Sequence, residues 1–141
     1  MKFKNQLCSR EQGEKLQKLR LRAKSLHIHI TKTVFEIDES ASNLPEFDII
    51  IQNIPVPHPC YNNDQHYNAY SGDELGVLLS QIPEHEFAIY CRKNSFDGRL
   101  YPQGISKLTL GKNGDNEARV KADLLILAIE KGIVKPDNLK L

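Results

Sequence analysis

The hydrophobic and polar positions of this chain fall into two kinds of repeat, one typical of strands and one typical of helices. Short runs rich in Ile, Val, Phe, Tyr and Thr predict strands at residues 26–35, 47–54, 87–92 and 105–110. Apolar residues three or four positions apart predict helices at about 9–20, 72–81 and 115–131. This order lacks a regular alternation of strand and helix, so we expect an α+β fold in which a mostly antiparallel four-stranded sheet packs with three helices.

Two capping boxes mark the starts of the first two helices. In such a box, a serine hydroxyl accepts a hydrogen bond from the backbone amide three residues later, and that residue's side chain reaches back. The pattern occurs at Ser9–Gln12 and at Ser71–Glu74. For the third helix we expect Asp115 as the N-terminal cap and Gly132 as the left-handed residue that ends it.

The third helix is apolar on all sides. Between residues 122 and 129 every position but one is Ala, Leu or Ile, and these residues do not form a single stripe. A helix of this kind is buried on more than one side. Either a second helix of the same chain or a second copy of the protein must cover it, and we favour a homo-oligomer.

The composition is that of one globular domain. The chain has 141 residues, of which 40% are hydrophobic and 26% charged. We therefore expect a single α+β domain over residues 1–141. The first residues lack the apolar core of a signal peptide and no apolar run is long enough for a bilayer, which favours a cytoplasmic protein without a membrane partner. The three cysteines show no C-x-x-C pattern, so we expect free thiols.

Charge is unevenly distributed along the chain. Residues 1–32 contain nine Lys or Arg and two acids, residues 33–91 contain ten acids and no Lys or Arg, and residues 92–141 contain ten Lys or Arg and six acids. Two interpretations are open. The surface is dipolar and favours self-association or an anionic partner, or the fold interleaves the two signs.

Residues 55–70 do not fit any regular element. They include three prolines, three asparagines and three tyrosines. A loop of this length inside a compact domain is typical of a functional segment, and the alternative is a surface excursion. As a functional segment, this loop would bind another protein.

The stretch Leu26–Thr31 carries two histidines at alternate positions. Strand alternation places His27, His29 and Thr31 on one face and the apolar residues on the other. We expect the histidine face to be in contact with solvent. Two imidazoles about 6.5 Å apart along a strand would bind a metal only if a third ligand came from the long loop, and we expect no metal. The candidate third ligands are His58, Cys60, Asp64 and His66.

An enzymatic alternative uses His29 and Thr31. The pattern His29-Ile30-Thr31 resembles one half of the two-histidine phosphoesterase site, in which two His-x-Thr/Ser motifs face each other. Acid and base catalysis need separate groups, and the sequence has no second copy of the motif. We therefore rank this alternative below binding.

Other catalytic or cofactor motifs are absent from the sequence. It has no G-x-S-x-G elbow, no Walker A loop and no G-x-G-x-x-G, so we expect no cofactor. Cys60 has histidines nearby but no helix start to lower its pKa. The segment 110–115 resembles an anion-binding turn, yet Asp115 and Glu117 would repel a phosphate there.

A basic and aromatic region near residue 100 is the candidate binding site. Guanidinium groups beside aromatic rings are suited to a nucleobase and its phosphate. The predicted ligand-binding residues are Tyr90, Arg92, Arg99, Tyr101 and Lys107. Near-neutral total charge and the lack of Trp favour a small nucleotide over a nucleic-acid polymer. The alternative is a solvated strand edge whose charges prevent aggregation.

A three-part pattern runs through the chain. It consists of Cys-Ser/Thr-x-Glu-Gln in residues 7–26, Tyr/Phe-Thr/Ser-x-x-Glu-Leu-Gly in residues 69–83, and a helix with Ala-Arg in residues 116–135. In this pattern the three segments resemble a family of small uncharacterised proteins of Bacteroidetes phages and prophages. The matching residues are Cys8, Glu11, Gln12, Leu16, Leu19, Tyr70, Glu74, Leu75, Gly76, Leu79, Ala118 and Arg119. Arg20 and Ser80 replace a glycine and a proline of the pattern. The resemblance implies a bacterial host cytoplasm and transfers no catalytic residue.

We therefore predict a phage accessory protein that acts by non-covalent binding, with sequestration of a host nucleotide immune signal as its role. The enzyme built on His29 and Thr31, and a protein-binding module built on residues 55–70, are the two alternatives.

Overall fold

The computed structural model describes residues 6–31, 48–52 and 66–141. Three α-helices, six strands and one short 3₁₀ helix lie in these ranges. In chain order they are α1 (Arg10–Lys18), β1 (His27–Thr31), β2 (Asp48–Gln52), β3 (His66–Asn68), α2 (Gly72–Ser80), β4 (His85–Arg92), β5 (Ser95–Pro102), β6 (Leu110–Gly114), α3 (Glu117–Glu130) and the 3₁₀ helix η5 (Pro136–Asn138).

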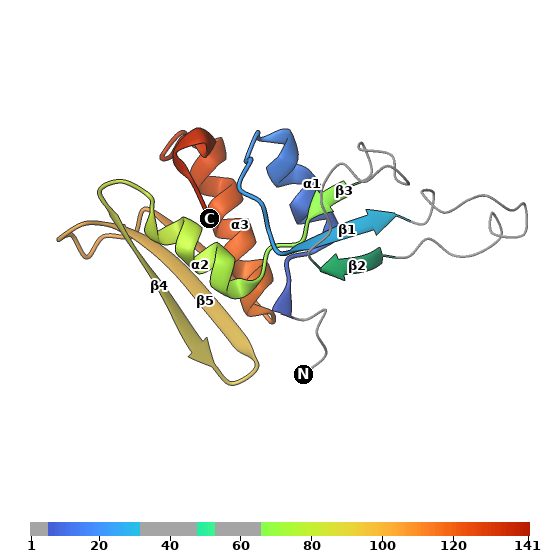
Figure 1. Cartoon of the computed structure of the whole chain (residues 1–141). Helices are drawn as coiled ribbons and strands as arrows, with labels where there is room; N and C mark the ends of the chain where they lie inside the picture. Colours follow the sequence, from blue (N-terminus) through green and yellow to red (C-terminus); the bar gives the residue numbers. More distant parts are fainter. Residues whose placement is uncertain (1–5, 32–47, 53–65) are drawn as a thin grey trace, which may run out of the picture.

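The α+β class is confirmed, but the strands form two sheets instead of one four-stranded sheet. One sheet has the order β2-β1-β3 and the other β4-β5-β6, and every pairing in both is antiparallel. In Figure 1 the β4–β5 hairpin lies on one side of the helices, and β1 and β2 lie on the other.

Hydrophobic alternation does not predict β3 or β5, and it places the strand before α3 too early in the sequence. The strand β3 has three residues, too few for a pattern, and it lies within residues 55–70, the segment that we expected to be a loop. The strand β5 carries Asp97, Gly98 and Arg99 at its centre, so it does not read as an apolar strand. The prediction of a strand at 105–110 was wrong. Ile105 and Leu108 are exposed, and β6 begins only at Leu110.

Helix starts and ends follow the predicted caps closely. Both halves of each capping box are present, at Ser9 and Gln12 for α1 and at Ser71 and Glu74 for α2. The cap of α3 is Asn116, one residue after the predicted Asp115. After α3, Gly132 has a φ of +72°, as expected for a left-handed residue that ends a helix.

The third helix lies at the centre of the molecule. It contacts α1, α2, β5 and β6, and Leu124, Leu125 and Ala128 have no exposed surface. Elements of the same chain therefore cover the apolar surface from which we expected self-association. Of the two alternatives for this helix, burial within one chain is the one that the structure shows.

A glycine allows α1 to approach β3 closely. A Cβ atom on Gly13 would lie 2.4 Å from the backbone oxygen of Asn68, closer than real Cβ atoms come to other heavy atoms. Since a backbone oxygen in a strand cannot move aside cheaply, only glycine fits here.

The longest helix within the described ranges, α3, has 14 residues. None of the described helices is long and apolar enough to cross a membrane.

Candidate functional site

The predicted ligand-binding tyrosines and arginines share one face of the β4-β5-β6 sheet. On β5, Gly98 and Leu100 face α3: a Cβ on Gly98 would lie 3.0 Å from Val120, and Leu100 is fully buried. Alternation therefore puts Asp97, Arg99 and Tyr101 on the opposite side. We call this side the outer face. It includes the even-numbered residues of β4, because these pair with the odd-numbered residues of β5.

Arg99 is held at the centre of the outer face. Its Nε and Nη2 atoms donate to Oδ2 of Asp97 at 2.9 and 2.7 Å, and Nη1 donates to the hydroxyl oxygen of Tyr101 at 3.3 Å. Its Cζ atom lies 4.9 Å from the ring centroid of Tyr90, a cation–π distance. The hydrogen bonds to Asp97 and then to Tyr101 raise the pKa of Arg99 above its usual value. The guanidinium is thus fixed in place before any ligand binds.

The structure therefore brings Tyr90, Arg99 and Tyr101 together. Asp97 belongs to the same group and was not predicted. Opposite charges two positions apart on a strand lie on one face, so the spacing of Asp97 and Arg99 was a usable signal.

Arg92 and Lys107 stand apart from this group. Arg92 is exposed at the end of β4 and lies on the outer face by alternation, and Lys107 is exposed between β5 and β6. Within the described part of the chain, no hydrogen bond, ion pair or cation–π contact joins Lys107 to the Arg99 group. A hollow of about 310 Å³ lies at the β4–β5 turn beside Arg92, with Asp97 and Asp115 also in its lining.

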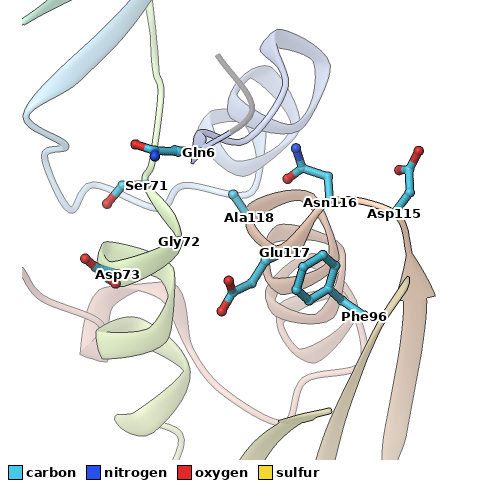
Figure 2. Close-up of a pocket in the computed structure, with 9 residues that line it drawn as sticks. All are labelled: Gln6, Ser71, Gly72, Asp73, Phe96, Asp115, Asn116, Glu117 and Ala118. Atoms are coloured by element: carbon cyan, nitrogen blue, oxygen red, sulfur yellow. The ribbon is translucent and has the colours of Figure 1, made fainter. Parts of the chain in front are cut away.

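A pocket of about 450 Å³ lies between the first turns of α2 and α3. Figure 2 shows Asp73 at the start of α2, and Glu117 and Phe96 across from it. Carboxylates at the positive ends of both helices satisfy those ends and repel phosphate. As expected from the sequence, Asp115 and Glu117 occupy the start of α3, so this pocket is unsuited to a nucleotide phosphate.

A buried lysine binds two of the residues that line that pocket, Gly72 and Glu117. Lys121 is 7% exposed, and its ammonium group donates to the Gly72 carbonyl at 3.1 Å and pairs with Glu117 at 3.1 Å. The same group lies 5.8 Å from the ring centroid of Phe87. Lys121 therefore joins α3 to α2 and β4 and acts as a structural link.

The histidine face of β1 is not in contact with solvent at His29, so that expectation was wrong. His29 is 3% exposed and Ile28 is 4% exposed, whereas Leu26, expected in the core, is 59% exposed. The reason is that β1 is the middle strand of its sheet and the segment at Leu7 and Cys8 lies against His29. The Nε2 atom of His29 donates to the Cys8 carbonyl oxygen at 2.9 Å.

The remaining metal and thiol candidates fall in different places. His58, Cys60 and Asp64 lie outside the described residues, as do the side chains of Thr31 and His66. In the described ranges no three His, Cys, Asp or Glu side chains are grouped so as to hold a metal ion.

The two described cysteines differ in reactivity. Cys8 is buried and Cys91 is exposed, and neither is in a disulfide. Desolvation by burial raises the pKa of the Cys8 thiol to about 12. A thiol with so high a pKa is a poor nucleophile near neutral pH.

The segment 55–70, expected to be a long loop, is partly built into the core. Residues 66–68 form β3, and Ala69 and Tyr70 are buried. The Tyr70 hydroxyl donates to the Ala23 carbonyl, and desolvation by burial raises the pKa of Tyr70. Residues 55–65 lie outside the described ranges, so their role in protein binding stays a prediction.

Eight of the twelve residues that carry the phage-family resemblance have structural roles here. Cys8, Leu16, Tyr70, Leu75, Leu79 and Ala118 are buried. The two cap residues also bind outside their own helices. Gln12 donates to the Arg119 carbonyl and to Asp123, and Glu74 accepts from Ser25 and from the Leu26 amide.

Comparison with known proteins adds no relative to this description. No protein-family model matches the chain, and no curated protein or solved structure matches it.

Proposed function

We propose that this chain acts by non-covalent binding and that its ligand is a nucleotide held on the outer face of the β4-β5-β6 sheet. The observation that carries the proposal is the position of Arg99, whose guanidinium is fixed by Asp97 and Tyr101 beside the ring of Tyr90. The proposal includes the predicted role as a phage accessory protein that sequesters a host nucleotide signal.

Each group on the face has a distinct part in this proposal. Tyr90 is 46% exposed, so it offers ring surface for stacking with a base. Arg99 fixes the orientation of that ring. Arg92 is exposed on the same face and is the cation that we assign to the phosphate.

The charge balance of the face favours a small ligand. Asp97 offsets the charge of Arg99, and the exposed Glu86 lies on the same face as Arg92. Affinity for a nucleic-acid polymer grows with the number of phosphates that Lys and Arg neutralise. A face whose acids match its bases neutralises few phosphates, so a mononucleotide or dinucleotide fits it better.

The environment of His29 favours binding over the phosphoesterase alternative. General acid or base catalysis requires the imidazole to reach the substrate. His29 is 3% exposed and its Nε2 atom is engaged with the Cys8 carbonyl. A hydrolase built on His29 would first have to break this bond and open the core.

Thermal shift and calorimetry test the proposal. A ligand at about one hundred times its Kd adds about 2.7 kcal/mol to stability, which raises the Tm by roughly 5–10 °C in a domain of this size. We expect such a rise with adenine or guanine nucleotides, cyclic dinucleotides or ADP-ribose, and we expect Tyr90→Ala and Arg92→Ala to abolish it.

Arg22→Ala is the matched control, because Arg22 is also an exposed arginine but lies outside the outer face. This variant should keep the full shift. The proposal is contradicted if none of these ligands shifts the Tm at about 1 mM, or if Tyr90→Ala binds as tightly as the native protein.

A further inference from the structure

The strand β4 has an open edge. In the order β4-β5-β6 it pairs with β5 on one side, and no strand of the described ranges pairs with it on the other. Its eight residues contain no proline and no lysine. Proteins usually protect a long edge with such residues or with bulges, because unpaired backbone groups otherwise bind another strand. The opposite edge, β6, is short and contains two glycines and Lys112.

The hairpin register determines which residues of β4 point to the open edge. Directly opposed residues in an antiparallel pair alternate between exchanging both backbone hydrogen bonds and exchanging none. Arg92 and Ser95 flank the two-residue turn, and the Gln103 amide donates to the Glu84 carbonyl at 2.9 Å. The even-numbered residues of β4 therefore bond to β5. The N–H and C=O groups of Phe87, Ile89 and Cys91 point away from it.

We propose that β4 pairs antiparallel with β4 of a second copy of this chain, with Ile89 on the two-fold axis. The backbone groups of Ile89 would then bond to those of Ile89 in the second copy. In this register Glu86 lies opposite Arg92 of the second copy, and Tyr90 lies opposite Ala88. Both carboxylate–guanidinium pairs form at once because the axis repeats the contact.

Charge complementarity selects the partner and the register. Glu86 and Arg92 are exposed, and neither has an ion-pair partner among the described residues. They are six residues apart on one strand, about 20 Å, so they cannot pair within one copy. A shift of two residues in one direction leaves both charges unpaired. The opposite shift leaves Glu86 unpaired and places Arg92 opposite Glu84, which lies outside β4 and has a φ of +60°. A shift of one residue turns the backbone groups out of alignment.

The pairing joins the two β4-β5-β6 sheets into one six-stranded sheet. The outer faces of the two copies become continuous across the axis. This interface uses a different surface from α3, which its own chain already covers. The inference does not depend on the nucleotide proposal, because its test measures mass and not ligand binding.

Exchange of the two charges is the first test, with mass measured by sedimentation equilibrium or light scattering over about 1–500 µM. We expect the native protein to approach twice 16.1 kDa. Glu86→Arg and Arg92→Glu each place like charges opposite each other twice and should weaken the dimer about tenfold. The double variant Glu86→Arg/Arg92→Glu restores both pairs and should return the Kd to within about threefold of the native value.

Two further variants test the edge itself. Ile89→Pro removes an N–H that points away from β5, so it should abolish the dimer while circular dichroism and Tm show a folded monomer. Lys112→Glu, on the opposite edge, should leave the Kd unchanged.

A cysteine pair tests the position of the axis. In a Cys91→Ser background, Ile89→Cys places two Cα atoms about 5.5 Å apart, within the range of a disulfide. Ala88→Cys places them about 8 Å apart. We expect a mild oxidant to cross-link the first variant and not the second.

Three outcomes would overturn the inference. These are a native mass of 16.1 kDa at every concentration, a dimer that survives Ile89→Pro, and a double charge exchange that fails to rescue the single variants.

Discussion

The Nε2 atom of His29 donates a hydrogen bond to the backbone carbonyl oxygen of Cys8, 21 residues earlier in the sequence, in a site where 3% of His29 is exposed. The bond ties the middle strand of one sheet to the segment that precedes α1. It makes His29 a structural residue.

Replacement of His29 should therefore lower stability. His29→Ala leaves the Cys8 carbonyl without this donor and opens a cavity beside β1, so we expect a loss of about 2–4 kcal/mol in the free energy of unfolding. Urea denaturation measures it. His85→Ala is the control, since His85 bonds only to the nearby Pro83 carbonyl at an exposed site, and it should cost less than about 1 kcal/mol. Equal losses in the two variants would contradict this account of His29.

Glu74 should be far more important for stability than its neighbour Asp73. The Glu74 carboxylate accepts from the Ser71 amide at 2.9 Å, the Ser25 hydroxyl at 2.8 Å and the Leu26 amide at 3.0 Å. Glu74→Ala removes a helix cap and a tertiary link together, and we expect a loss of about 2–3 kcal/mol. Asp73→Ala, at an exposed position in the same helical turn, should change stability by less than about 1 kcal/mol. Chemical denaturation of both variants would show whether this difference exists.

Two helical glycines should respond to alanine in opposite directions. Alanine raises helix propensity by about 1 kcal/mol relative to glycine. At Gly76 the added Cβ would lie 3.6 Å from the Lys121 ammonium, an ordinary contact, so Gly76→Ala should stabilise the protein by about 0.5–1 kcal/mol. At Gly13 the Cβ would lie 2.4 Å from the Asn68 oxygen, so Gly13→Ala should destabilise it by more than about 2 kcal/mol. A higher Tm for Gly13→Ala would show that α1 and β3 do not approach as described.

Stability should fall as the pH rises above 9. Burial raises the pKa of Cys8 from 9.0 to about 12, so in this window the unfolded thiol releases its proton and the folded one keeps it. The unfolded state then binds fewer protons, and the free energy of unfolding drops by up to about 1.4 kcal/mol per pH unit. Tyr70, whose pKa is also raised, adds to the loss at higher pH.

The contribution of Cys8 can be isolated by comparing the native protein with Cys8→Ala. The variant starts from lower stability at pH 8 because it loses buried volume, but its stability should fall less between pH 9 and 11. Parallel urea titrations across this range measure the two slopes. Identical slopes would mean that the Cys8 thiol is not protected from ionisation in the folded state.

The helices could be predicted because their signals are local. Serine caps, apolar spacing and Gly132 are all contained within a few residues of the element that they define. The sheets could not be predicted fully, because β5 has one polar outer face and one face that packs on α3, with Gly98 at the closest approach. Hydrophobicity alone does not distinguish such a strand from a loop.

The candidate site, like the sheets, could be predicted from the sequence only in part. Residue types were enough to select Tyr90, Arg99 and Tyr101, which the hairpin register then brings together. His29 is buried against the segment at Cys8, which is itself held by the hydrogen bond from the Cys8 amide to the Tyr70 carbonyl at 2.8 Å. No local pattern around residues 26–31 contains this information.

The central position of α3 has a consequence for synthesis on the ribosome. The helix α3 packs on α1, α2, β5 and β6, and it is translated after every strand and both other α-helices of the described ranges. Because domains generally fold as units, we expect the leucines that pack on α3 to stay exposed in the nascent chain until residue 130 has left the exit tunnel.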